Sequence, residues 1–388
     1  MKRPCRSTVT ANDIRRRAKS VGGSLLGEGK TGRVTDVCKD IGDFCLPTVQ
    51  DARDIAYLKY YSMSNDGAVR VKTLSDTAGI TKFLQLTEAE ARNLVAKKYR
   101  SYWRLTGHVS AENEFLKEIR GVSDVLKSLG IDIAKACSPI KFIEAGGENV
   151  LGMCIKKRAI LEAPEYVTFF QKCERSMEDA CKPGGGGLTL VEFIAALRSI
   201  IGHVCTIQEK DVAHGDLKPA NMMECAHGWK LIDWNMAYML DWATIQEKDG
   251  LQPAHRGSSP MFYMLHNVPF FDAMIDNYVK DFMMAQFYPD KLPAFRIFMK
   301  RSVKSYWLAT QTRDENITRP KRDQFDLLKY NSDLHSLGIF VYAISAIFFG
   351  SNERLSTFAE RLCVCSADMI LTAEVAKLEL EALAAHGS

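Results

Sequence analysis

Two carboxylates, a lysine and a side-chain amide lie close together between residues 214 and 235. The first string is His-Gly-Asp-Leu-Lys-Pro-Ala-Asn (214–221), and the second is Leu-Ile-Asp-Trp-Asn (231–235). The apolar residues at 229–232 predict a short strand between two loops. One Asp suits the orientation of a hydroxyl group, and a second Asp with an Asn suits Mg²⁺ on a nucleotide. The rest of the chain is therefore expected to supply the other parts of a phosphate-transfer site.

Composition is that of an ordinary soluble globular protein. The chain has 388 residues, 46% apolar and 25% charged, which is enough for two lobes. The net charge of +4 gives no indication of nucleic-acid binding. The eleven cysteines show no zinc spacing or disulfide framework, so reduced thiols are expected. No apolar signal sequence opens the chain, and the most apolar segment, 337–349, is too short to span a bilayer, so we expect a cytoplasmic protein without membrane association.

A glycine-rich string near the start of the chain fits the pattern G-x-G-x-x-G-x-V. Glycines let the backbone approach phosphates closely. A dinucleotide-binding turn would open a helix, but residues 34–38 have the pattern of a strand, and a Walker A loop would need glycine where the chain has Ser24. A strand–turn–strand flap over ATP fits best. The candidate phosphate-binding residues in this flap are Gly27, Glu28, Gly29, Gly32 and Val34.

Residues 214–221 resemble the catalytic loop of eukaryotic-type protein kinases. His-Gly-Asp stands in place of His-Arg-Asp, and Asp-Trp-Asn stands in place of Asp-Phe-Gly. Residues 331–339 resemble the start of the helix that this family buries in its large lobe. The resemblance covers most of residues 25–350. It implies an α+β, bilobal protein-kinase-like fold, with a small β-rich N-lobe containing one main helix and a larger helical C-lobe.

The resemblance assigns a role to each polar residue of the central stretch. Asp216 would orient the substrate hydroxyl or accept its proton, and Lys218 would neutralise the phosphoryl group in transfer. A lysine at this place implies a Ser/Thr substrate. The residues implied to hold Mg²⁺ or Mn²⁺ are Asn221 and Asp233, and those implied to support the loop are His214 and Asp333.

A lysine and a glutamate in the N-terminal part complete the expected ATP site. Residues 68–72 alternate like a strand and resemble the V-A-I-K strand of kinases, so Lys72 would contact the α- and β-phosphates. Residues 110–129 predict a helix with a serine cap and apolar residues at helical spacing. Its glutamate would pair with Lys72. Counting along the helix favours Glu118, and Glu114 is the alternative.

The expected domain organisation follows from these positions. Residues 1–24 form a basic tail, and residues 25–157 form the N-lobe with insertions near 40–67 and 73–109. Residues 158–388 form the C-lobe with an insertion near 267–330, where a partner protein could bind. A surface linker at residues 183–187 leads into a helix that starts near Leu188 or Thr189.

Three departures from the family pattern are visible. Gly215 stands where kinases carry the arginine that pairs with a phosphorylated activation loop, so control by such phosphorylation is less expected. Asn235 stands where they have glycine, and Asn tolerates the left-handed backbone of such a turn. Residues 255–264 resemble the end of an activation segment, but the following Ala-Pro-Glu element is degenerate.

The favoured function is that of an ATP- and Mg²⁺-dependent protein serine/threonine kinase acting on a protein substrate. A small-molecule kinase is an alternative, because His-Gly-Asp and Ile-Asp-Trp also resemble the aminoglycoside and choline phosphotransferases. A further alternative is a pseudokinase that serves as a nucleotide-binding interaction module through its insertions.

Overall fold

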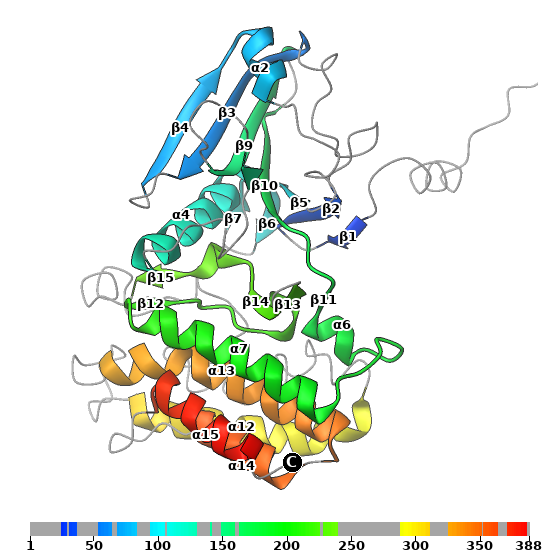
Figure 1. Cartoon of the computed structure of the whole chain (residues 1–388), viewed down its shortest axis with the longest axis vertical. Coiled ribbons are helices and arrows are strands. Elements are labelled where there is room, and N and C mark those ends of the chain that lie inside the picture. Colours follow the sequence, from blue (N-terminus) through cyan, green and yellow to red (C-terminus); the bar gives the residue numbers. More distant parts are fainter. Residues whose placement is uncertain are drawn as a thin grey trace, which may run out of the picture. The chain divides into compact units, whose positions relative to one another are not determined.

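The computed structural model is a mixed α+β structure with a large antiparallel sheet and several helices (Figure 1). The chain divides into two compact units. Unit 1 contains residues 1–119 and 131–172, and unit 2 contains residues 120–130 and 173–388. The residues described are 25–28, 31–36, 53–63, 68–83, 94–104, 107–129, 140–141, 149–159, 163–225, 228–239, 288–310, 325–350, 352–363 and 371–385. The predicted basic tail therefore lies outside the described residues.

Unit 1 is built on one eight-stranded sheet with the strand order β1-β2-β5-β10-β9-β3-β4, in which β8 also pairs with β9. A core of apolar side chains from these strands, including Leu58 and Met153, packs with Ile80 of the short helix α2 (Thr77–Phe83). The strands are β1 (Leu25–Glu28), β2 (Gly32–Asp36), β3 (Ile55–Met63), β4 (Val69–Leu74), β5 (Leu94–Tyr99), β8 (Ile140–Lys141), β9 (Asn149–Lys157) and β10 (Glu165–Gln171).

The strand that lies next to the glycine-rich hairpin is not the expected one, which carries Lys72. That neighbour is β5, which lies inside the segment 73–109 that was expected to be an insertion. β5 is buried along almost its whole length, so its sequence lacks the alternation of a half-exposed strand. β4, which has the alternating sequence, lies instead at the far edge of the sheet, and its residues 70–73 are all exposed. The unit boundary also falls after residue 172 rather than 157, because β10 pairs with β5 and β9.

The main helix of unit 1 is α4 (Ala111–Leu129), whose last residues are grouped with unit 2. The Ser110 hydroxyl accepts a bond from the Asn113 amide at 3.2 Å, so the predicted cap is confirmed. Phe115 packs its ring against three tyrosines of the sheet. A Cβ at Gly152 would lie 2.6 Å from that ring, so glycine leaves room for it. The tyrosines in contact with Phe115 are Tyr61, Tyr99 and Tyr166. A small hairpin, β6 (Tyr102–Arg104) and β7 (Gly107–Val109), precedes the helix.

Unit 2 begins with two helices, α6 (Met177–Cys181) and α7 (Leu190–Gln208). Thr189 and Glu192 form a capping box at the start of α7, as the predicted helix start requires. Among the described helices, α7 alone is long and apolar enough to cross a membrane on length and composition. It buries a row of apolar residues and packs on helix α15 (Ala373–Ala385) and strand β14 (Gly228–Leu231), as a core helix does.

Two small sheets in unit 2 contain or flank the central polar stretch along the sequence. One contains β11 (Arg175–Ser176), β13 (Met222–Cys225) and β14, and the other pairs β12 (Val212–Ala213) with β15 (Tyr238–Met239). The central stretch runs from β12 through β13 and β14 to β15. Its residues are thus held by strand pairing at four successive places.

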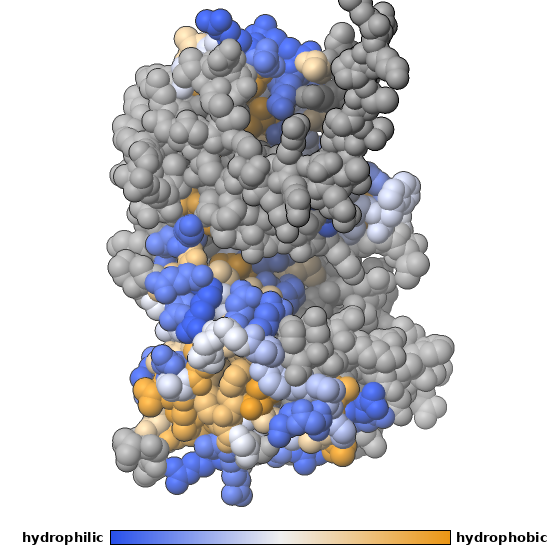
Figure 2. All heavy atoms as spheres, turned by 90° about the vertical axis from the view of Figure 1, so that its right-hand side faces the viewer, coloured by the Kyte–Doolittle hydropathy of each residue, from blue (hydrophilic) through white to orange (hydrophobic). Residues whose placement is uncertain are grey.

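The central helix of unit 2 is α13 (Phe325–Phe348), and residues 333–341 of it are buried. It packs on α14 (Glu353–Cys363) and α12 (Leu292–Thr310), where Phe298 stacks on Tyr342 with ring centroids 3.8 Å apart. The predicted burial of the apolar segment at its end is confirmed, although the helix begins earlier than expected. α12 lies in the segment expected to be an insertion, and its apolar residues belong to the core. In Figure 2, apolar side chains gather low on the visible face of this unit.

His335 of α13 is fully buried, and burial lowers its pKa to about 4. In the unfolded chain its pKa is about 6.5. Between these values the unfolded chain binds the proton, so stability present above pH 6.5 is lost as the pH falls towards 4. We expect this residue to lower the free energy of unfolding by roughly 3 kcal/mol between pH 7 and pH 4. Urea unfolding of the wild type and of His335→Leu at both pH values measures the difference, and equal pH slopes in the two proteins would contradict it.

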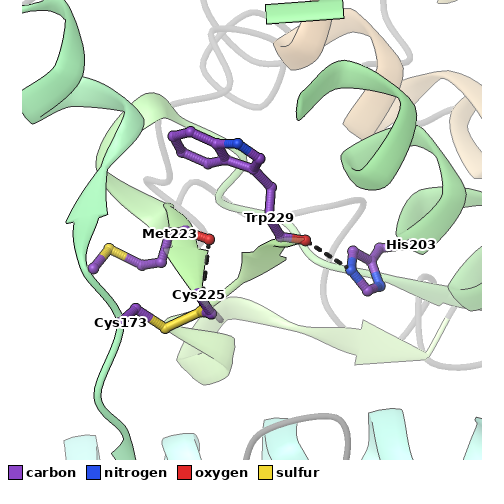
Figure 3. Close-up of a disulfide and its surroundings, with 5 residues drawn as sticks. All are labelled: Cys173, His203, Met223, Cys225 and Trp229. Carbon is purple, nitrogen blue, oxygen red and sulfur yellow. Dashed lines mark hydrogen bonds between the residues drawn. A yellow bond between two sulfur atoms is a disulfide. The ribbon is translucent and has the colours of Figure 1, made fainter. Parts of the chain in front are cut away.

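A disulfide joins Cys173, the first residue of unit 2 after β10, to Cys225 at the end of β13 (Figure 3). The expectation of reduced thiols is wrong for this pair. The pairing of Arg175 with Glu224 between β11 and β13 brings the two cysteines together across 52 residues, a separation that no sequence motif marks. The described cysteines outside this disulfide are Cys154, Cys181, Cys205 and Cys363.

Breaking this disulfide is expected to lower the free energy of unfolding by about 4 kcal/mol, because it closes a loop of 52 residues in the unfolded chain. Guanidinium unfolding with and without reductant measures the loss in the wild type. A double variant, Cys173→Ser with Cys225→Ser, serves as the control and should not respond to reductant. Equal sensitivity of both proteins to reductant would assign the effect to other thiols.

Candidate active site

Asp333 of α13 fixes the start of the loop that contains residues 214–221. Its carboxylate accepts bonds from the backbone amides of His214 at 2.8 Å and Gly215 at 3.0 Å. Burial raises the pKa of Asp333, while His214 and the two amide bonds act in the opposite direction. Gly215 has a φ of 76°, a left-handed conformation that favours glycine. A residue more than a hundred positions away in the chain therefore holds the loop in a backbone shape that Gly215 permits.

The His214 ring connects three parts of the site. Its Nδ1 accepts the Asp216 amide at 3.2 Å, and its Nε2 lies 3.0 Å from the carbonyl oxygen of Ile232. A neutral ring with the proton on Nε2 satisfies both contacts. The ring also packs on Trp234, with ring centroids 4.5 Å apart. His214 thus fixes the loop against the segment that carries the second carboxylate.

Asp216 is the centre of a compact polar group. Its Oδ2 lies 2.6 Å from the Lys218 Nζ and 2.9 Å from the Asn221 Nδ2. The same amide nitrogen donates to the Asp216 backbone oxygen at 2.9 Å. The Asp216 side chain is 6% exposed and that of Lys218 is 36% exposed. A carboxylate with one charge-assisted partner and one amide partner is held in a single orientation.

Asp233 lies next to Asn221 at the base of the β13–β14 hairpin. The Ile232 amide donates to the Asn221 carbonyl at 3.0 Å, and Met222 pairs with Leu231. Asp233 itself has the left-handed values φ 67° and ψ 61°, which are uncommon for a residue other than glycine. Such strain is concentrated at functional sites. The left-handed residue of this turn is therefore Asp233, and not Asn235 as expected.

Asn221 and Asp233 fit a magnesium ion by their chemistry. Both Nδ2 hydrogens of Asn221 bond to Asp216, so the amide oxygen is the ligand atom that Asn221 would offer, beside the carboxylate of Asp233. Within the described residues there is no cluster of three or more His, Cys, Asp or Glu side chains. One or two protein oxygens, completed by water and substrate phosphates, are what Mg²⁺ commonly takes.

Trp234 is buried and lies against the last part of α4. A Cβ at Gly121 would overlap the backbone carbonyl oxygen of Trp234, so glycine lets the helix approach this turn closely. The contact sets the position of the chain directly after Asp233. Residues 255–264, the expected end of the activation segment, lie outside the described residues.

In unit 1, the glutamate expected to form an ion pair is bonded to a different lysine. The Lys97 Nζ of β5 lies 2.9 Å from the Glu118 Oε2 of α4, and the two side chains are 10% and 1% exposed. The Tyr99 hydroxyl donates to the same oxygen at 3.3 Å and contacts Thr168 at 3.0 Å. Glu114, the alternative, contacts Lys117 at 3.1 Å within the same helix.

The prediction that Lys72 pairs with Glu118 is wrong. Lys72 is an exposed residue of β4, and its Nζ lies 5.8 Å from the centroid of the Tyr60 ring. Four strand spacings, about 19 Å, separate β4 from β5. The missed signal was the run Leu-Val-Ala-Lys at 94–97, an apolar strand that ends on lysine just before the helix with the glutamates.

The glycine-rich string forms the expected strand–turn–strand. β1 and β2 are antiparallel, with Gly27 paired to Val34 and Glu28 to Arg33. Gly29 lies outside the described residues. A Cβ at Gly32 would overlap the carbonyl oxygen of Lys98, so this glycine also permits close contact with β5.

Comparison with known proteins adds no relative to this picture. No protein-family model matches the chain, and no curated protein matches it. The assignment of the site therefore depends on the sequence motifs and on the geometry within each unit.

Proposed function

We propose that the chain is an ATP- and Mg²⁺-dependent phosphotransferase with a protein-kinase-like fold, acting on Ser or Thr hydroxyls of proteins. The observation that carries this proposal is the group around Asp216, in which one carboxylate oxygen contacts both Lys218 and Asn221. Asp333 holds the backbone of the same loop. Phosphoryl transfer needs little covalent chemistry from the protein and depends on such positioning and charge.

Each polar residue of the loop has a separate role in the proposed reaction. Asp216 orients the hydroxyl of the substrate and accepts its proton. Lys218 places a positive charge beside this carboxylate, where it also counters the negative charge of the phosphoryl group in transfer. Asn221 keeps Asp216 in one rotamer through its amide bonds. None of these residues forms a bond to phosphorus.

Asn221 and Asp233 would hold the magnesium ion. A magnesium ion held there would supply positive charge against the phosphates of the nucleotide. The left-handed backbone at Asp233 and the hairpin contacts at Asn221 fix the two residues in place before any ligand arrives. Such preorganisation avoids the free energy of ordering the site on binding.

Unit 1 supports the same function through Lys97 and Glu118. Protein kinases require an ion pair between a lysine of the third lobe strand and a glutamate of the main helix, and the lysine contacts ATP phosphates. In unit 1 the strand after the β1–β2 hairpin in the sheet carries Lys97, and α4 carries Glu118. We therefore assign the phosphate-contacting role to Lys97 in place of Lys72.

Turnover of the purified full chain with radiolabelled ATP tests the proposal. With Mg²⁺ or Mn²⁺ present, we expect transfer to Ser and Thr of generic protein substrates or of the chain itself, and none with chelator. Phosphorylation of aminoglycosides or choline without protein labelling would assign the chain to small-molecule kinases. Nucleotide binding without any turnover would assign it to the pseudokinases.

A further inference from the structure

Strand β4 forms one of the two edges of the large sheet in unit 1, opposite β1. It pairs with β3 on one side, and no described strand pairs with its other side. Figure 1 shows it as the outermost strand of the sheet, drawn in light blue. The six residues of β4 make this edge long enough to serve as a template for another strand.

The side chains along this edge are open to solvent. Four consecutive residues, 70–73, are exposed, and Val71 is 52% exposed. Charged side chains on an edge strand oppose unselective pairing. A strand that is added to β4 therefore has to match the charges of Arg70 and Lys72.

The two faces of β4 differ in chemistry. Arg70 pairs with Ser62 and Lys72 pairs with Tyr60, so both cations project on the face of the sheet that carries Tyr60. Val71 pairs with Tyr61 on the opposite face. A strand added to this edge would meet two positive charges on one face and an apolar side chain between them on the other.

This pattern argues against a second copy of the chain as the occupant. A symmetric dimer through this edge would pair β4 with β4 in antiparallel fashion. Centred on Val71, the pairing would place Arg70 opposite Lys72 in both directions. Like charges directly opposite in a sheet are destabilising.

We propose that the outer edge of β4 binds an extended segment of a partner protein in which acidic and β-branched apolar residues alternate. The backbone groups of the edge supply the hydrogen bonds of strand addition. Arg70 and Lys72 select acidic residues on one face, and Val71 selects an apolar residue on the other. This inference is independent of the proposed phosphotransfer.

The test uses a fluorescent peptide, acetyl-Thr-Val-Glu-Val-Glu-Val-Thr-amide, with the full-length protein at low salt. The double variant Arg70→Glu with Lys72→Glu should weaken binding about tenfold or more, since it reverses two ion pairs. Arg53→Glu with Lys210→Glu makes the same change in net charge at exposed positions away from β4, and it should bind as the wild type does. A peptide methylated on alternate backbone nitrogens keeps its charge but loses its donors, and it should also bind at least tenfold more weakly.

Three results would overturn the proposal. The first is no saturable binding of the peptide to the wild type. The second is equal binding of the methylated and unmethylated peptides, which would show attraction by charge without strand addition. The third is equal loss of binding in the two double variants, which would place the peptide elsewhere. Selective loss in the β4 variant, together with loss on methylation, supports strand addition at this edge.

Discussion

Replacing Asp216 with Asn is expected to lower the turnover number about a thousandfold while the protein stays folded. The amide keeps the size of the side chain but accepts no proton from the substrate hydroxyl, a contribution of about 10²–10⁴ in rate. It also removes the negative charge that faces the Lys218 Nζ at 2.6 Å. Initial rates of phosphate transfer at saturating ATP measure the effect, and thermal unfolding of both proteins checks the fold.

A matched control for this substitution lies on β13, the strand that follows the loop of Asp216. Glu224 of β13 pairs with Arg175 at 2.7 Å and takes no part in the group around Asp216. Glu224→Gln makes the same chemical change, from carboxylate to amide, and should leave turnover within about twofold, because a part-exposed ion pair contributes little. Full activity of Asp216→Asn would show the assigned mechanism to be wrong for any substrate.

Replacing Lys97 with Met is expected to lower catalytic efficiency at least a hundredfold, whereas Lys72→Met leaves it unchanged. Removing one preorganised positive group beside a charged transition state costs about 10²–10³ in rate. Lys97 is nearly buried and bonded to Glu118, while Lys72 is exposed on an edge strand. Phosphate-transfer rates over a range of ATP concentrations separate the two variants. Loss of activity in Lys72→Met alone would restore the assignment made from the sequence motif.

The Lys97 variant needs a second comparison, because it leaves Glu118 buried without its lysine. Glu118→Gln keeps a side chain that the Tyr99 hydroxyl can still contact, and it removes the uncompensated charge. The double variant should then recover stability relative to Lys97→Met but recover no activity. Recovered activity would show that Lys97 acts only by stabilising the fold.

The local structure of the site between residues 214 and 235 could be predicted from the sequence. Residues 214–221 and 231–235 lie where their spacing indicated, and the strand between them forms as β14. The starts of α4 and α7 were predictable because Ser110 and Thr189 are local signals that act over three residues. The roles of these residues in catalysis remain predictions.

The features that could not be predicted depend on contacts between distant segments. β4 has the alternation of a strand and ends near a lysine, but its place at the sheet edge depends on pairing with β3. β5 lies in the centre of the sheet, where burial on both faces removes the alternation that marks a strand. The disulfide likewise depends on the pairing of β11 with β13. Local sequence patterns therefore predict the polar motifs, but they do not predict the order of the strands in the sheet.

The bonds from Asp333 to the loop amides have a consequence for biosynthesis. The loop that carries Asp216 is shaped by a residue 119 positions later in the chain than His214. A nascent or truncated chain that ends before α13 therefore contains residues 214–235 but lacks the anchor of the loop backbone. Under the proposed function, activity would therefore arise only once α13 has been synthesised and packed.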